Sequence, residues 1–148
     1  MDSKKIVFLA ISVVAVVVCF LFISLSNTTK VFAPVSINEE QTVNGLTVTL
    51  KTAQVIISNN PTLKLTFQLT NNSLSPVDVS SDAITVFTDD QKQQATEPTA
   101  VTIALPNETV DIIKTVNYKQ GCSHVIVLYG NTSTPLDSWV IKCNDLEA

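Results

Sequence analysis

The sequence predicts an all-β antiparallel domain that follows a single membrane-spanning helix. Residues 6–25 contain no charged side chain, whereas the chain after them is mixed and polar. From residue 35 onward, polar and apolar residues alternate in short runs that turn-forming residues separate. A period of two is typical of strands with one buried face, because helices repeat about every 3.6 residues. The prediction is therefore a chain of two parts, a hydrophobic helix and a β-sheet domain.

The N-terminal segment 6–25 is long enough to cross a bilayer as a helix. Its twenty residues would extend about 30 Å, which is the thickness of the hydrocarbon core of a membrane. Lys4 and Lys5 precede the segment, and positive charge beside such a helix tends to stay in the cytoplasm. We therefore expect a cytoplasmic N-terminus at 1–5, a signal anchor at 6–25 in contact with membrane lipid, and an external stalk at 26–34.

A cleaved signal peptide is the alternative to this uncleaved anchor. Ser24 and Ser26 are small residues of the kind that a signal peptidase accepts. Cleavage after Ser26 would release a secreted protein in place of a single-pass membrane protein. The apolar part of a signal peptide is usually about 7–15 residues long, so the greater length of segment 6–25 favours the anchor.

The external domain, residues 35–148, is expected to contain about eight strands. Alternating apolar and polar residues occupy the runs 46–50, 63–70 and 101–105. Each run describes a strand with one dry and one wet face. Turn-forming clusters separate the runs at short intervals, at 44–45, 59–61, 71–73, 89–90 and 106–107. Among these, Asn44-Gly45 is a strong signal for a two-residue hairpin. This density of strands and turns is typical of an antiparallel sandwich.

The C-terminal hairpin predicts a disulfide between Cys122 and Cys143. If the two cysteines face each other across an antiparallel pair, the turn falls on residues 130–135, where Gly, Asn, Ser, Thr and Pro cluster. The same register places one stripe of side chains on a buried face: Cys122, His124, Ile126, Leu128, Trp139, Ile141 and Cys143. A disulfide requires an oxidising compartment, in agreement with an external location. Two unpaired core thiols are the alternative.

Four acceptor patterns for N-glycosylation also agree with an external location. They begin at Asn27, Asn71, Asn107 and Asn131. A fifth asparagine, Asn60, is excluded because Pro61 follows it. Three of the four patterns lie at predicted turns or in the stalk, where a glycan is tolerated.

Three stretches resemble a widespread prokaryotic immunoglobulin-like family of unknown function. Residues 44–50 resemble its opening hairpin, residues 63–72 its central strand with an Asn-rich turn, and residues 105–109 its Pro-Gly-Glu turn. Asn107 stands where that family usually has Gly, and Asn tolerates left-handed backbone angles. Family members are mostly secreted lipoproteins and signal-anchored surface proteins. The resemblance implies an immunoglobulin-like β-sandwich outside the cytoplasm and supplies no catalytic residues.

Composition and residue counts argue against several classes of function. The chain has nine Lys, no Arg and thirteen acidic residues, for a net charge of −4, so no basic stripe is available for nucleic acid. His124 is the only histidine, and we expect it to be an inward structural residue rather than a catalytic base. One histidine cannot complete a blue-copper or zinc site. Four loop carboxylates are expected to be turn formers rather than calcium ligands: Asp78, Asp82, Asp89 and Asp90.

We therefore predict a surface-displayed, non-catalytic module that binds an unknown protein or envelope partner, with no cofactor, metal or catalytic residue. The alternative is a subunit of a pilin- or archaellin-like filament, a homo-oligomer built by bundling of the helix at 6–25. That segment has no Gly for close helix packing, and no small residue follows Lys4-Lys5, where a leader peptidase would cut. These features favour the anchored module. An enzyme is the third and least favoured hypothesis.

Overall fold

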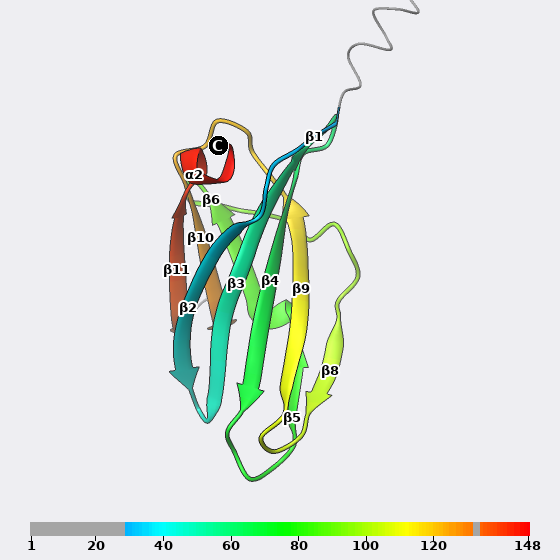
Figure 1. The fold of residues 1–148 in the computed structure, drawn as a ribbon, viewed down its shortest axis with the longest axis vertical. Helices are drawn as coiled ribbons and strands as arrows, with labels where there is room; N and C mark the ends of the chain where they lie inside the picture. Colours follow the sequence, from blue (N-terminus) through cyan, green and yellow to red (C-terminus); the bar gives the residue numbers. More distant parts are fainter. Residues whose placement is uncertain (1–28, 132–133) are drawn as a thin grey trace, which may run out of the picture.

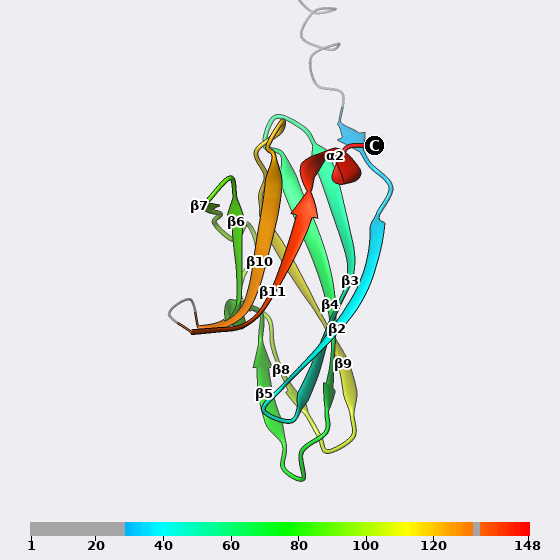
Figure 2. The same ribbon diagram turned by 90° about the vertical axis from the view of Figure 1, so that its left-hand side faces the viewer.

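The computed structural model describes residues 29–131 and 134–148, which form two antiparallel sheets packed face to face (Figure 1; Figure 2). The first sheet contains β1 (Lys30–Val31), β2 (Val35–Val43), β3 (Leu46–Ile57), β4 (Thr62–Asn71) and β9 (Thr109–Asn117). The second contains β6 (Ile84–Thr88), β7 (Gln91–Lys92), β10 (His124–Asn131) and β11 (Thr134–Lys142). A small third sheet pairs β5 (Val77–Ser80) with β8 (Val101–Ala104). The all-β antiparallel prediction is confirmed for the described residues.

Two short helical pieces complete the described part of the chain. The 3-10 helix η1 (Ser81–Ala83) links β5 to β6, and the helix α2 (Cys143–Leu146) follows β11. The strand order is β1-β3-β4-β9 in the first sheet, where β2 also pairs with β3, and β11-β10-β6-β7 in the second. About eight strands were expected; the described residues hold eleven, and β1 and β7 have two residues each.

The hairpin between β2 and β3 forms where the sequence predicts it. Val43 pairs with Leu46 across a two-residue turn. Asn44 and Gly45 have φ values of 47° and 79°, the left-handed values that a tight hairpin turn requires at both central positions. A Cβ at Gly45 would also lie only 3.3 Å from the Cβ of Ser73, so a larger residue would meet both strain and crowding.

The predicted alternation of β4 supplies the centre of the core. Its inward side chains, Leu63, Leu65, Phe67 and Leu69, are fully buried, and their neighbours are only partly covered. The ring of Phe67 meets that of Trp139 edge to face, with the centroids 5.8 Å apart. Because β4 and β11 belong to different sheets, this aromatic contact connects the two layers. Edge-to-face geometry suits the opposite charges of ring edge and ring face.

The C-terminal hairpin forms, but its predicted register is wrong by one residue. His124 pairs with Lys142 and Val127 with Trp139, so most paired numbers sum to 266 rather than the expected 265. A shift of one residue moves every side chain of a strand to the opposite face. The buried residues of β10 are therefore Val125, Val127 and Tyr129, in place of the expected His124, Ile126 and Leu128. On β11, Trp139 and Ile141 are buried as expected, as is Cys143 at the start of α2.

The cause of this error is the position of the two cysteines. Cys122 and Cys143 are joined by a disulfide, with their Cα atoms 5.8 Å apart, which is the pairing that the sequence predicts. However, Cys122 precedes β10 and Cys143 begins α2. Both half-cystines lie outside the ladder, so the bond does not determine the register of the strands between them.

The structure also moves the N-terminal boundary of the domain. Of the predicted stalk 26–34, the residues from 29 onward are described, and β1 pairs with β3. The Phe32 amide donates to the carbonyl of Val55 at 3.0 Å, and its ring is buried in the core. This part of the predicted stalk therefore belongs to the domain. No helix among residues 29–131 and 134–148 is long and apolar enough to span a membrane, and the predicted anchor at 6–25 lies outside those residues.

Candidate functional site

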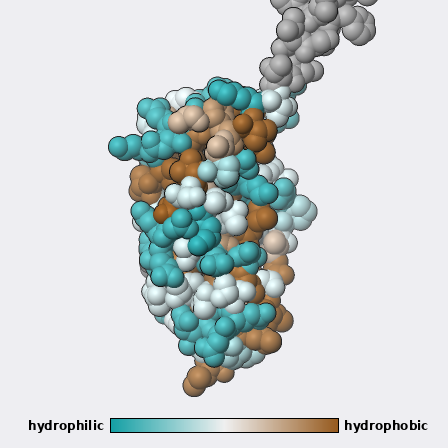
Figure 3. All heavy atoms as spheres, in the orientation of Figure 1, coloured by the Kyte–Doolittle hydropathy of each residue, from teal (hydrophilic) through white to brown (hydrophobic). Residues whose placement is uncertain are grey.

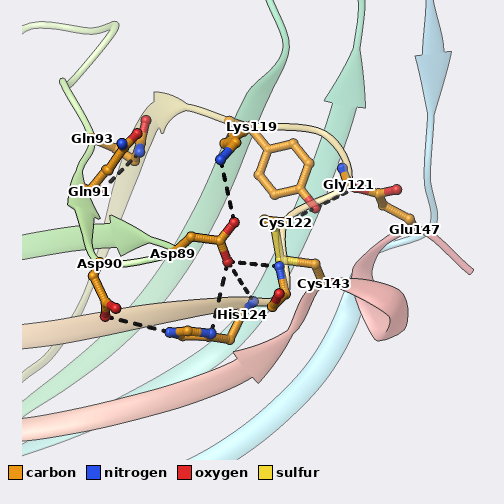
Figure 4. A network of polar contacts seen from close by, with 12 residues as sticks. Asp89, Asp90, Gln91, Gln93, Lys119, Gly121, Cys122, His124, Cys143 and Glu147 are labelled. Carbon is orange, nitrogen blue, oxygen red and sulfur yellow. Dashed lines mark hydrogen bonds and ion pairs between the residues drawn. A yellow bond between two sulfur atoms is a disulfide. The ribbon is translucent and has the colours of Figure 1, made fainter.

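The first candidate site is a polar network at the end of the domain that carries α2 (Figure 4). It starts with the turn between β6 and β7, where Asp89 and Asp90 have φ values of 46° and 64°. Aspartate tolerates this left-handed conformation better than most residues. The turn brings both carboxylates beside the start of β10, because β6 and β10 are paired neighbours in the second sheet.

Asp89 holds the loop that leads into β10. Its Oδ1 accepts hydrogen bonds from the amides of Ser123 at 2.8 Å and His124 at 3.4 Å, and its Oδ2 lies 3.6 Å from Lys119 Nζ. The hydrogen bond from the Ser123 amide is the main reason that the pKa of Asp89 is lowered from its ordinary value. The carboxylate is therefore ionised at neutral pH and connects β6 to the loop between β9 and β10.

His124 does not face inward as the sequence analysis expected, because of the register shift. Its side chain is 34 % exposed, with Nδ1 3.9 Å from Asp89 Oδ1 and Nε2 3.7 Å from Asp90 Oδ1. Both ring nitrogens thus face carboxylates. A catalytic histidine instead directs one nitrogen at a nucleophile and the other at an orienting acid. The geometry suits a structural histidine flanked by two carboxylates.

The same end of the domain is cross-linked to the C-terminus. The Tyr118 hydroxyl donates to Glu147 at 2.6 Å, and the Gly121 amide donates to the same carboxylate oxygen at 3.2 Å. Burial raises the pKa of Tyr118 well above its ordinary value, so the phenol stays protonated and can donate. Together with the nearby Cys122–Cys143 disulfide, these contacts fasten α2 to the loop after β9. We therefore interpret this network as one that stabilises this end of the domain.

The four aspartates that were expected to form turns lie in three separate places. Asp89 and Asp90 form the β6–β7 turn as expected. Asp78 instead lies within β5, and Asp82 lies in η1, where it accepts from Thr99 and lies near Lys114. Within the described ranges, no three of the residue types His, Cys, Asp and Glu are grouped so that they could hold a metal ion.

The second candidate site is a lateral pocket of about 630 Å³ between the two sheets. Its lining includes Asp82 of η1, Ile84 and Val86 of β6, Lys92 of β7 and Lys114 of β9. Lys114 is the only charged residue that is buried in the part of the chain described. The sequence analysis did not single out this pocket. The sequence offers one indication, because Lys114 alternates with Ile112 and Val116 and so shares their face of a strand. Which face of β9 is buried, however, is known only once the pairing of β9 is known.

The candidate glycosylation sites have different environments. Asn107 is exposed, with φ of 61° in the turn before β9, a left-handed conformation that Asn tolerates. Asn71 is fully buried, and both of its amide hydrogens point at carbonyl oxygens, those of Ser75 and Ala104. A glycan on Asn71 is incompatible with this fold, so that candidate is corrected. Asn27 and the side chain of Asn131 lie outside what the structure describes.

Four exposed apolar residues lie in the loop before β5 and along β8. Leu74 is 96 % exposed in the loop before β5, and three residues of β8 and its C-terminal flank are more than half exposed: Val101, Ile103 and Leu105. Figure 3 shows apolar groups at the lower tip of the molecule and along the side on which Figure 1 places β8. The other exposed apolar residues among those described, Val31, Ile113 and Val140, lie on β1, β9 and β11.

The fold and its candidate sites define an antiparallel β-sandwich domain with a reinforced end and a lateral pocket. No protein-family model and no curated protein matches the sequence. Solved structures do resemble the fold. One is the "putative lipoprotein (ycdA)" of Bacillus subtilis, with a TM-score of 0.63 and 15 % identity over 76 % of this chain. The match spans 41 % of that protein's length.

Two further structures of unassigned function resemble the chain over most of their own length. A conserved hypothetical protein of Bacillus anthracis has a TM-score of 0.56 and 13 % identity, covering 77 % of this chain and 97 % of that one. A functionally unknown protein of Listeria monocytogenes has a TM-score of 0.54 and 10 % identity, covering 78 % and 87 %. At such identities the comparisons establish a shared all-β fold.

Proposed function

We propose that this protein is a membrane-tethered module of the cell envelope that acts by binding and not by catalysis. The Cys122–Cys143 disulfide carries the proposal, because such a bond persists in an oxidising compartment and is rare in the cytosol. The apolar segment 6–25 would hold the chain in membrane lipid with residues 1–5 inside. The fold of the Bacillus subtilis "putative lipoprotein (ycdA)" is compatible with this address.

We assign the sandwich to the immunoglobulin-like class as part of the same proposal. The assignment is supported by the order in which the chain alternates between the two sheets. It places β3 and β4 in the first sheet, β6 in the second, β9 in the first again, and β10 and β11 in the second. Crossing connections between two antiparallel sheets are typical of immunoglobulin-like sandwiches.

The direction of the tether suggests which surface meets a partner. β1, the first described strand, lies at the same end as α2, whereas the loop before β5 and the end of β8 lie at the opposite end (Figure 1). A chain anchored before β1 would present Leu74 and the outer face of β8 away from the membrane. An unidentified protein or envelope component would then contact this remote end.

The test is to locate the full-length chain in cells and determine the state of its thiols. Of its three cysteines, Cys19 lies in the proposed anchor, so a Cys19→Ser background leaves only Cys122 and Cys143. We expect the chain in the carbonate-washed membrane fraction, degraded by external protease, and resistant to maleimide labelling until a reductant is added. A Val16→Lys/Val17→Lys variant serves as the matched control and should lose membrane retention.

The mature N-terminus, read by mass spectrometry, separates the alternatives. An intact Met1 agrees with the anchor, a start at Asn27 with secretion, and a start near Ile6 with the filament. A chain found in the soluble cytosolic fraction with both thiols free would overturn the proposal.

A further inference from the structure

We propose that the lateral pocket is a binding site for a small organic carboxylate, in which the ammonium group of Lys114 binds the carboxylate. This site is separate from the proposed role as a membrane-tethered binding module. The carboxylate proposal depends only on the pocket, so either proposal can fail without affecting the other. Four features of the described residues support it: the construction of the pocket, the burial of Lys114, the weakness of its existing partner, and the chemistry of the walls.

The pocket is built by a segment that joins the open edges of the two sheets. The Gln93 amide donates to the Val86 carbonyl at 2.8 Å on β6, and the Asn117 amide donates to the Gln94 carbonyl at 3.0 Å on β9. Thr96 donates to the carbonyl of Thr115 in the same way, at 3.0 Å. Residues 91–96 therefore cross from one layer to the other and hold the edges at a set separation. The pocket lies beside this segment, with η1 contributing Asp82.

Lys114 occupies a position where the strand pattern calls for an apolar residue. It lies between Ile112 and Val116 on the inward face of β9, and both of these neighbours are buried in the core. The side chain of Lys114 is 11 % exposed. A buried ammonium group is costly unless it is paired and hydrogen-bonded. A residue that violates the local pattern in this way is expected mainly at functional sites.

The existing partner of Lys114 does not fully satisfy it. Its Nζ lies 3.8 Å from Asp82 Oδ1, which is beyond hydrogen-bonding distance. Both oxygens of Asp82 instead accept from the Thr99 hydroxyl at 2.8 Å, and the Asp82 side chain is 67 % exposed. Lys114 therefore has donors to offer to an anion in the pocket, and a bound carboxylate would supply the close partner that Asp82 does not.

The walls of the pocket indicate what kind of anion fits. Ile84 and Val86, only 2 % and 1 % exposed, form a buried apolar floor beside the exposed Ala95. Lys92 and Gln94 add a second cation and an amide donor, whereas Gln93 Nε2 already donates to the Gln91 carbonyl at 2.9 Å. The volume of about 630 Å³ falls within the range of small-molecule sites, about 300–1,000 Å³. Lys114 beside a small apolar floor and a few polar groups favours a carboxylate that carries a short apolar body over a fully hydrated inorganic anion.

The test measures binding of benzoate to the full-length chain in lipid nanodiscs by equilibrium dialysis, with empty nanodiscs as the blank. We expect one saturable site. Lys114→Met, which keeps the length of the side chain, should weaken binding by about tenfold or more, since a charge-assisted hydrogen bond is lost. Asp82→Asn should strengthen binding, because it removes the competing carboxylate. Lys142→Met, which changes an exposed lysine of β11, is the matched control and should bind like the wild type.

A second comparison does not depend on any variant folding. Benzamide has the shape of benzoate without its charge, and it should bind the wild-type chain at least about tenfold more weakly. The proposal is overturned if benzoate shows no saturable binding, if benzamide binds equally well, or if a folded Lys114→Met chain binds as the wild type does. In the last case Lys114 serves only to position η1 through Asp82.

Discussion

Replacing the buried Asn71 with Ala should cost far more stability than the same change at its exposed neighbour Asn72. Asn71 is fully buried at the end of β4. Its Nδ2 donates to the carbonyls of Ser75 and Ala104, each at 2.8 Å. Its Oδ1 accepts from the amide of Ser73 at 2.9 Å and from the hydroxyl of that residue at 2.7 Å. One side chain thus connects β4, the loop before β5, and β8.

The size of the effect follows from these four contacts. A hydrogen bond contributes about 0.5–1.5 kcal/mol net, and a buried polar group left unpaired costs about 1–3 kcal/mol. The Ala variant loses all four contacts, and the buried carbonyl of Ala104 loses a donor. We therefore expect the free energy of unfolding to fall by about 3 kcal/mol.

The assay is urea unfolding of the full-length chain followed by tryptophan fluorescence, since Trp139 is the only tryptophan and is buried. Asn72→Ala is the matched control, because the neighbouring amide makes one exposed contact, to the Thr47 hydroxyl at 2.7 Å. It should cost less than about 1 kcal/mol. Equal losses for Asn71→Ala and Asn72→Ala would refute the reasoning that burial sets the cost.

Three further perturbations test other parts of the structure. The double change Cys122→Ala/Cys143→Ala opens a loop with a sequence separation of 21 and should lower the free energy of unfolding by about 3 kcal/mol; adding reductant to the wild type should reproduce the loss. Trp139→Ala, at the contact between the sheets, should cost about 3–5 kcal/mol by calorimetry, against less than about 0.5 kcal/mol for the exposed Val140→Ala. Asp89→Asn tests a pH effect. Because the Asp89 pKa is lowered from 3.8, its contribution is complete above that pH and is lost as the pH falls through the folded-state value. The urea midpoints of wild type and variant should therefore converge on acidification, and parallel midpoints would contradict this account.

Local patterns in the sequence predicted the parts of the fold that depend on near neighbours. The alternation of 63–70 predicted β4 and its buried face, because the period of a strand is a property of the backbone. Asn44-Gly45 predicted a turn, because those two residues adopt left-handed angles at little cost. The pairing of Cys122 with Cys143 was predicted from the composition of the turn between them and from a buried stripe; the bond forms, although the β10 half of that stripe is wrong.

Pairing between strands distant in sequence determined which face of each strand is buried, and therefore the environment of individual side chains. The register of β10 against β11 moved His124 from the core to a partly exposed position between two carboxylates, since one residue of shift exchanges the two faces. Asn71 matched a glycosylation motif in sequence, yet the contact of β4 with β8 buries it as a structural hub. Lys114 became a pocket residue only because β9 places it inward at the open edge between the sheets. The periodicity of a strand can be read from the sequence alone, because it is a property of neighbouring residues. Burial and charge pairing depend on contacts between segments that are distant in sequence, and only the assembled sheets determine them.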